Sequence, residues 1–233
     1  EDGIRYLERI KALGLRGVMM PGNPAVADYD DPMYAPFWEA AVDLGLPLSF
    51  HILTSQSDTF RTRGPKLNAF MSIIRGCQDI IGLFVFGGVF ARHPKLRMVC
   101  VEADAGWAPH FMYRMDHAWD RHRYWLTGSK IERRPSDYFR EHVYLTFQDD
   151  WVAFQVKDLC NVRRLMWAND FPHSDSTWPN SQAVLAEQAG DPPQDLGAAR
   201  LSELRRRALV RAADQRGARV ARPALPVEHV HPE

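Results

Sequence analysis

Four short apolar runs in this sequence end in polar residues whose side chains could do chemistry. The residues at these ends are one histidine, several carboxylates and one amide. Imidazole and carboxylate groups together form the ligand set of zinc and other first-row divalent ions, so the combination predicts a metal site. The runs with the residues that end them are Leu46-Pro-Leu-Ser-Phe-His51, Met98-Val-Cys-Val-Glu102, Val143-Tyr-Leu-Thr-Phe-Gln148-Asp149 and Leu165-Met-Trp-Ala-Asn-Asp170.

Each of these residues also has an explanation without function. His51 alone is more simply a hydrogen-bonded core histidine, and Asp170 alone could cap the turn at Phe171-Pro172. Glu102 could form a salt bridge to an arginine. His173, three residues after Asp170, could be a turn residue that packs against Trp178. The functional interpretation depends on the joint occurrence of these side chains.

Alternating apolar strands and helices predict which elements position these residues. Because the strands show no period-two alternation, we expect a parallel sheet covered on both faces, either doubly wound or a (β/α)8 barrel. The expected strands are 17–20, 46–53, 97–101, 143–147 and 164–168, and the expected helices are 4–13, 32–44, 65–92, 107–124, 136–141 and 151–159.

A barrel is favoured because the motifs of nucleotide-binding sheets are missing. No GxGxxG follows a strand, and no GxxxxGK[ST] occurs in the sequence. A complete barrel has eight strands and five are predicted here, so we expect an α/β fold of the incomplete (β/α)8 TIM-barrel type, with strands four to eight present. In such barrels the chemistry takes place at the carboxyl ends of the strands, where the polar residues described above are found.

Three stretches resemble the amidohydrolase-related branch of the amidohydrolase superfamily, which includes aminocarboxymuconate semialdehyde decarboxylase, resorcylate-type decarboxylases and many metal-dependent hydrolases. The resemblance covers about residues 1–190 by the order and spacing of its motifs. The stretches are Leu46-Pro-Leu-Ser-Phe-His51, Phe90-Ala-Arg-His-Pro-Lys-Leu-Arg-Met-Val-Cys-Val-Glu102-Ala-Asp-Ala-Gly-Trp107-Ala-Pro109, and Leu165-Met-Trp-Ala-Asn-Asp170-Phe-Pro-His173 continuing to Ser176-Thr-Trp-Pro179.

The resemblance implies a distorted barrel with one catalytic divalent ion, zinc or alternatively manganese. It assigns His51 and Asp170 to the metal centre. The decarboxylases of the family carry an acid-base histidine on the sixth strand, where this sequence has Glu102, so Glu102 could serve instead as a general base. His173 would contact a substrate carboxylate or a ligand. Trp107 and Trp167 are expected to pack the core or the pocket wall.

Three functions stay open on this basis. The first is a metal-dependent hydrolase that directs water to a small carbonyl, ester, lactone or amide substrate. The second is a metal-dependent nonoxidative decarboxylase of an aromatic or enoic acid. The third is an inactive remnant, since the first-strand metal motif of the family is missing before Gly17 and the sequence opens at Glu1 within an expected helix. With so few metal donors, the 233 residues alone are expected to be poorly active.

The two ends of the sequence differ in composition. Residues 1–192 are expected to form the partial barrel, and residues 193–233 an Arg-rich helix and a Pro-containing tail that diverge from the family. Residues 199–222 hold eight arginines against one glutamate and one aspartate. Because no aromatic residue is available there for stacking, a solvated helix is favoured over a nucleic-acid site. Arg114 is similarly expected to be a surface arginine rather than an anion anchor.

Overall composition points to a small-molecule partner. The 29 basic and 29 acidic residues give a formal net charge of zero, which offers no general attraction to nucleic acid or an anionic membrane. Three cysteines without CxxC spacing predict free thiols. Apolar stretches are expected to break before the roughly 20 residues of a membrane span, and no signal peptide is recognisable, so a cytoplasmic protein is expected. Association into a homo-oligomer stays open.

Overall fold

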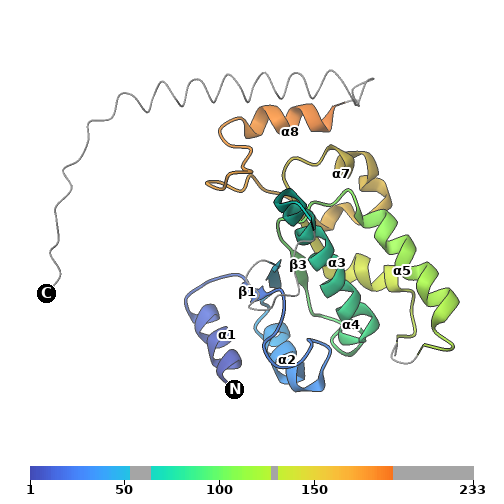
Figure 1. The fold of residues 1–233 in the computed structure, drawn as a ribbon. Coiled ribbons are helices and arrows are strands. Elements are labelled where there is room, and N and C mark those ends of the chain that lie inside the picture. The colour runs from blue at the N-terminus through green and yellow to red at the C-terminus, as the bar shows by residue number, and fades with distance from the viewer. Residues whose placement is uncertain (53–63, 127–130, 191–233) are drawn as a thin grey trace, which may run out of the picture. The chain divides into compact units, whose positions relative to one another are not determined.

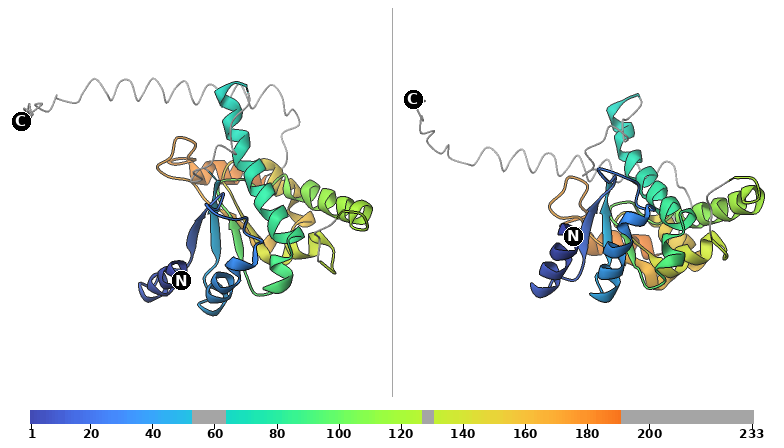
Figure 2. Two further views of the ribbon diagram at one scale, coloured as in Figure 1. Left: turned by 60° about the horizontal axis from the view of Figure 1, so that its bottom comes forward. Right: turned by 90° about the horizontal axis from the view of Figure 1, so that it is seen from below.

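Five parallel strands form the centre of the molecule. The computed structural model describes residues 1–52, 64–126 and 131–190, and residues Glu1–Ala189 make one compact unit. The strands lie in sequential order in a single sheet, and Figure 2 shows them side by side. They are β1 (Val18–Pro21), β2 (Leu48–His51), β3 (Met98–Cys100), β4 (Val143–Phe147) and β5 (Leu165–Trp167).

Helices connect the strands, as parallel pairing requires (Figure 1). Short 3₁₀ turns at Pro32–Tyr34, Lys66–Ala69, Lys157–Leu159 and Val162–Arg164 precede or extend them. The α-helices of the described residues are α1 (Asp2–Ala12), α2 (Ala35–Asp43), α3 (Phe70–Phe86), α4 (Val89–Arg92), α5 (Ala108–His122), α6 (Pro135–His142), α7 (Trp151–Val156) and α8 (Ser181–Ala189).

The strand order confirms the α/β class and decides between the two predicted architectures. A doubly wound sheet reverses its strand order at a switch point, whereas β1 to β5 follow one another without a reversal. Sequential parallel strands are the arrangement of a (β/α)8 barrel, here with five of its strands. In the described part β1 and β5 are the edges, and Met19 on β1 is 63% exposed.

The hydrophobic core lies between the sheet and its helices. Alternate side chains of the central strands, such as Leu48, Phe50 and Leu145, are buried against aromatic residues of the helices, including Trp38 and Phe84. The intervening side chains are only half-buried, because they face the side of the sheet that would form the barrel interior. Of the two faces expected to be covered, the described residues bury fully only the one that packs against the helices.

The single helix predicted for residues 65–92 is also corrected. The helical stretch is divided at Gly87 and Gly88, between α3 and α4. Gly88 adopts a φ of 72°, which favours glycine. A Cβ atom on Gly87 would lie 2.4 Å from the Cβ atom of Asp30, so the chain approaches this point too closely for a side chain. Helix α8 was not predicted, and the predicted Arg-rich helix and tail, residues 193–233, lie outside the described residues.

One helical segment departs from the expectation that apolar stretches break before the length of a membrane span. Leu67–Phe86 spans 20 residues and passes a membrane-span test of length and composition, with 39% of the tested window buried. A core helix of a globular protein passes the same test, and Ile81 and Phe84 on this helix belong to the core described above.

Candidate metal centre

The strand ends bring the predicted site residues into one pocket. His51 is the last residue of β2, Glu102 follows β3, and Asp170 and His173 follow β5. All four line a cavity of about 360 Å³. Its other lining residues are Ala69, Phe70, Ile73, Gln148, Ser174 and Asp175.

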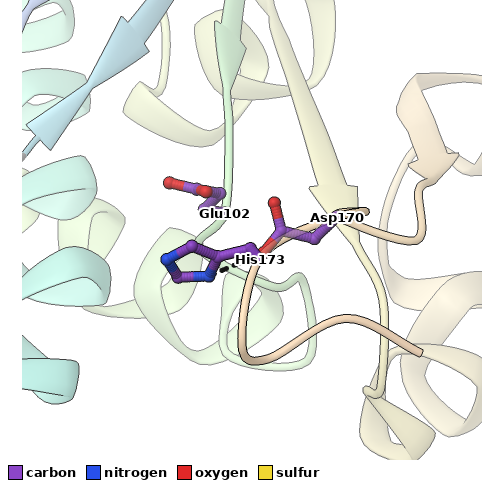
Figure 3. Close-up of side chains that lie close together, drawn as sticks. All are labelled: Glu102, Asp170 and His173. Atoms are coloured by element: carbon purple, nitrogen blue, oxygen red, sulfur yellow. Dashed lines mark ion pairs between the residues drawn. The ribbon is translucent and has the colours of Figure 1, made fainter. Parts of the chain in front are cut away.

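Three of these residues form a compact set of metal-binding groups. Glu102, Asp170 and His173 each place one ligand atom within 4.8 Å of the others (Figure 3). The Nδ1 atom of His173 lies 3.0 Å from Oδ2 of Asp170. His51 lies outside this set and contacts it through Glu102, with 3.2 Å between its Nε2 atom and Oε2 of Glu102. His51 thus contacts Glu102, and Glu102 lies close to the Asp170–His173 pair.

Burial differs among the four side chains. His51 and Glu102 are 29% and 27% exposed, and Asp170 is 20% exposed. His173 is 59% exposed, so it lies at the mouth of the pocket while Asp170 lies deeper. His51, Glu102 and Asp170 are therefore the better candidates for holding an ion. The more exposed imidazole of His173 is better placed to meet a substrate.

Unusual backbone conformations occur at the two carboxylates of the set. Glu102 has a φ of 59° and Asp170 a φ of 54°, both in the left-handed region that costs a residue other than glycine on the order of 1 kcal/mol. Hydrogen bonds hold both turns: the Glu102 N–H donates to Oγ1 of Thr146 over 3.1 Å, and the His173 N–H donates to the Asp170 carbonyl over 2.8 Å. Such strain is concentrated at functional sites in proteins.

The loop after β5 is fixed by its own polar side chains. The Ser176 hydroxyl donates to the Asn169 carbonyl over 2.6 Å, and the Asn169 side chain accepts the Phe171 N–H. Directly after β4, the Gln148 amide donates to the carbonyl and the carboxylate of Asp175, at 3.1 and 3.2 Å. The loop that carries His173 is therefore tied to a neighbouring strand end.

A carboxylate next to the site anchors the loop after β3. Asp150 accepts the N–H groups of Ala105 and Gly106, both at 2.7 Å, and caps α7 by accepting the Ala153 N–H. A Cβ atom on Gly106 would lie 2.6 Å from the Cβ atom of Val152, so this contact also requires a glycine. These bonds position the chain that follows Glu102.

The electrostatics at this end of the sheet favour a cation. Burial raises the pKa of the Asp104 carboxyl to about 6, and the negative charges of Asp150, Asp175 and Asp149 add to the increase. Among the described residues that line the pocket, none is a lysine or an arginine. Two carboxylates and an imidazole in an acidic setting without a basic counter-ion fit a divalent metal ion.

The non-functional alternatives fare differently in the structure. Among the described residues, Glu102 pairs with His51 and not with an arginine, and the turn after Asp170 is capped by Asn169. The Trp178 ring packs against Phe171, with 4.7 Å between centroids, while His173 pairs with Asp170. The described contacts of Glu102, Asp170 and His173 thus differ from the three non-functional alternatives, and the metal assignment itself stays a prediction.

The other predicted residues are not among those that line the cavity. Arg114 is exposed on α5, as a surface arginine, and Trp107 packs against Phe111 and Phe139. Trp167 donates its indole N–H to the Gln148 carbonyl over 3.1 Å. The cysteines are free, and Cys77 and Cys100 are buried.

Sequence reasoning missed Asp175 and the apolar wall of the pocket. Ala69, Phe70 and Ile73 form this wall and come from the beginning of α3 and the turn before it. They follow no strand, so the rule that active-site residues close strands could not find them. A polar run after Asp170 was the available signal for Asp175.

Comparisons with known proteins agree with this architecture. A family model described as amidohydrolase matches residues 1–216. The chain is similar to the solved structure of an amidohydrolase from Mycobacterium avium subsp. paratuberculosis K-10, with 19% identity and a TM-score of 0.65, over 82% of this chain and 50% of that one.

Two decarboxylase structures are also similar. One is a 5-carboxyvanillate decarboxylase from Sphingomonas paucimobilis, with 24% identity, a TM-score of 0.63, and coverage of 82% of this chain and 58% of that one. The other is a dihydroxybenzoic acid decarboxylase from Polaromonas sp. JS666 with bound manganese and 2-nitroresorcinol, with 21% identity, a TM-score of 0.60, and coverage of 81% and 59%. The chain thus spans half to three-fifths of the length of the structures compared.

Proposed function

Because the chain belongs to the amidohydrolase family, we propose that its pocket holds one divalent metal ion and that the whole protein is a metal-dependent hydrolase of a small carbonyl, ester, lactone or amide compound. The observation that carries the proposal is the convergence of Glu102, Asp170 and His173 within 4.8 Å at the carboxyl ends of the strands. Zinc is the expected ion, with manganese as the alternative.

Asp170 and His51 are proposed to hold the ion. Asp170 is the least exposed of the four side chains and is oriented by its contact with His173. His51 approaches from the β2 side and contacts Glu102 at 3.2 Å. A bound divalent ion supplies Lewis-acid polarisation of a substrate oxygen. Further donors from the rest of the whole protein would complete the site, since a catalytic zinc needs three protein ligands.

Glu102 is proposed as the general base. Its carboxylate contacts His51 and belongs to the compact set with Asp170, so it lies beside any ion held by those two residues. There it can take a proton from a water molecule as the water oxygen bonds to the substrate carbonyl carbon, and the proton passes to the leaving group when the acyl bond breaks. His173, exposed at the mouth, would contact the polar group of the substrate.

Nonoxidative decarboxylation is the second candidate. It is favoured by the description of two similar structures as decarboxylases, one of them with bound manganese. The apolar wall around Phe70 suits a flat ring opposite the polar groups. The glutamate at position 102, where the family's decarboxylases carry a histidine, favours hydrolysis instead.

Oxygen-18 labelling separates the two reactions. The protein, extended by any further coding sequence, is loaded with Zn²⁺ or Mn²⁺ and given lactones, esters and hydroxylated aromatic acids in H₂¹⁸O. Hydrolysis places one ¹⁸O in the product acid, whereas decarboxylation releases carbon dioxide and places a solvent proton on the product carbon. Turnover that survives complete metal removal would contradict the proposal. An extended protein that binds no metal would also contradict it and would favour the inactive remnant.

A further inference from the structure

A second polar cavity lies at the opposite end of the strands from the candidate metal centre. It has a volume of about 290 Å³. Four of its lining residues, Pro47, Arg97, His142 and Arg164, each immediately precede one of the strands β2 to β5. Because neighbouring parallel strands begin at the same edge of a sheet, these residues meet at one place although up to 117 positions separate them in sequence.

The charge of this cavity is strongly asymmetric. Lys95, Arg97 and Arg164 line it, and Glu141 is the one acidic side chain among its described lining residues. Arg133 already binds both carboxylate oxygens of Glu141, at 2.9 and 2.6 Å, and this contact holds the pKa of Glu141 below its usual range. Within the described ranges, Lys95, Arg97 and Arg164 have no ion pair within 4.0 Å. In the described part of the chain, the cavity therefore has three basic side chains without a bonded carboxylate, although the whole chain has a net charge of zero.

The walls of the cavity are held in place by packing. The Arg164 guanidinium lies 4.3 Å from the centroid of the Tyr144 ring, a cation–π contact that restricts its orientation. His142 is buried, bonds the Leu96 carbonyl through Nδ1 at 2.8 Å, and stacks on Phe90 with 4.4 Å between centroids. Arg164 and His142 are thus held in place before a ligand binds. Lys95 and Arg97 are exposed, so their side chains can turn toward a ligand.

We propose that this cavity binds a small anion that bears one or two phosphate groups. Arginine presents parallel N–H donors that match phosphate oxygens, and lysine adds a point charge, so two arginines and a lysine around one cavity suit a dianion. The volume of about 290 Å³ lies just below the usual range for ligand sites, about 300–1,000 Å³, and fits a compact phosphate compound. This site is independent of the proposed hydrolase activity, because the two cavities lie at opposite ends of the strands.

Calorimetric titration with inorganic pyrophosphate and with inorganic phosphate tests the proposal. The titrations use metal-free protein at a constant ionic strength, so that binding at the candidate metal centre does not contribute. We expect one site per chain. We also expect at least about a tenfold loss of affinity in Arg97→Glu and in the milder variant Lys95→Gln, because each removes a charge-assisted hydrogen bond. Arg114→Glu is the matched control, since it makes the same charge change at an exposed position of α5 outside this cavity.

Several outcomes of these titrations would contradict the proposed anion site. The proposal is overturned if neither pyrophosphate nor phosphate binds detectably at a concentration of about 10 mM. Equal losses in Arg97→Glu and Arg114→Glu also overturn it, because they indicate general charge attraction. Tighter binding of a 20-base-pair DNA than of pyrophosphate would point to a nucleic acid and not to a small anion. Lys95→Gln keeps the test informative if Arg97→Glu fails to fold, since Lys95 is exposed.

Discussion

The Nδ1 atom of His173 lies 3.0 Å from Oδ2 of Asp170, which joins the most exposed and the least exposed of the four candidate site residues. The contact spans one tight turn, in which the His173 N–H also donates to the Asp170 carbonyl. Asp170 is therefore held by both its backbone and its side chain. A carboxylate fixed in this way can offer its remaining lone pairs to an ion without reorganisation.

Replacement of Asp170 tests the metal assignment directly. In Asp170→Asn the shape is kept and the negative charge is lost, so we expect the Zn²⁺ or Mn²⁺ affinity to fall by about 100-fold or more. Chelator-competition titration measures this change. Asp158→Asn serves as the control, because its carboxylate is 87% exposed in a turn after α7 and does not line the pocket. Unchanged metal affinity in Asp170→Asn would remove this residue from the site.

Gln148 is predicted to position the loop that carries His173. Gln148→Leu removes both hydrogen bonds to Asp175, so the free energy of unfolding should fall by about 1 kcal/mol. Metal affinity should fall as well, since the loop after Asp170 loses its tie to β4. Urea denaturation and metal titration measure the two effects. If Gln148→Leu bound metal as the unaltered protein does, the tie would have only a structural role.

Alanine substitutions at two glycines near the end of α3 are expected to change the free energy of unfolding in opposite directions. In Gly87→Ala the new methyl group meets Asp30 Cβ at 2.4 Å and the Leu83 carbonyl at 2.6 Å, so a loss of about 2 kcal/mol is expected. A Cβ atom on Gly82 meets nothing within 4 Å, so Gly82→Ala should stabilise the helix by about 0.5–1 kcal/mol. Thermal and urea unfolding test the pair, and equal effects would contradict the close approach at Gly87.

The carboxyl of Asp104 should make stability depend on pH. Its pKa is raised from 3.8 to about 6, so the folded protein binds this proton more tightly than the unfolded chain does. The stabilising contribution is complete below pH 3.8 and is lost as the pH rises through about 6. Asp104→Asn removes the charge and keeps an acceptor for the Gln148 N–H. At pH 7.5 it should increase the unfolding free energy by about 1 kcal/mol, after allowance for partial exposure.

The measurement for Asp104 is urea denaturation of metal-free protein from pH 4.5 to pH 8. The difference between Asp104→Asn and the unaltered protein should increase with pH across this range. A difference that stays constant, or that is largest at the acidic end, would show that Asp104 carries no raised pKa in the folded state.

Local patterns in the sequence determined the elements and the chemistry at their ends. The five apolar runs became strands within a few residues of their predicted bounds, and Val143–Phe147 matched at both ends. His51, Glu102 and Asp170 could be selected because a parallel α/β fold places strand-closing residues on one edge. These inferences need only the neighbours of each residue along the chain.

Contacts between distant residues were decided by the tertiary structure alone. The sequential strand order, the pairing of His51 with Glu102 and of Gln148 with Asp175, and the contribution of Phe70 to the pocket all depend on register and helix packing. The left-handed turns at Glu102 and Asp170 likewise have no glycine to mark them in the sequence. Periodicity reports which face of an element is apolar, whereas the partner of each side chain is set by how whole elements pack together.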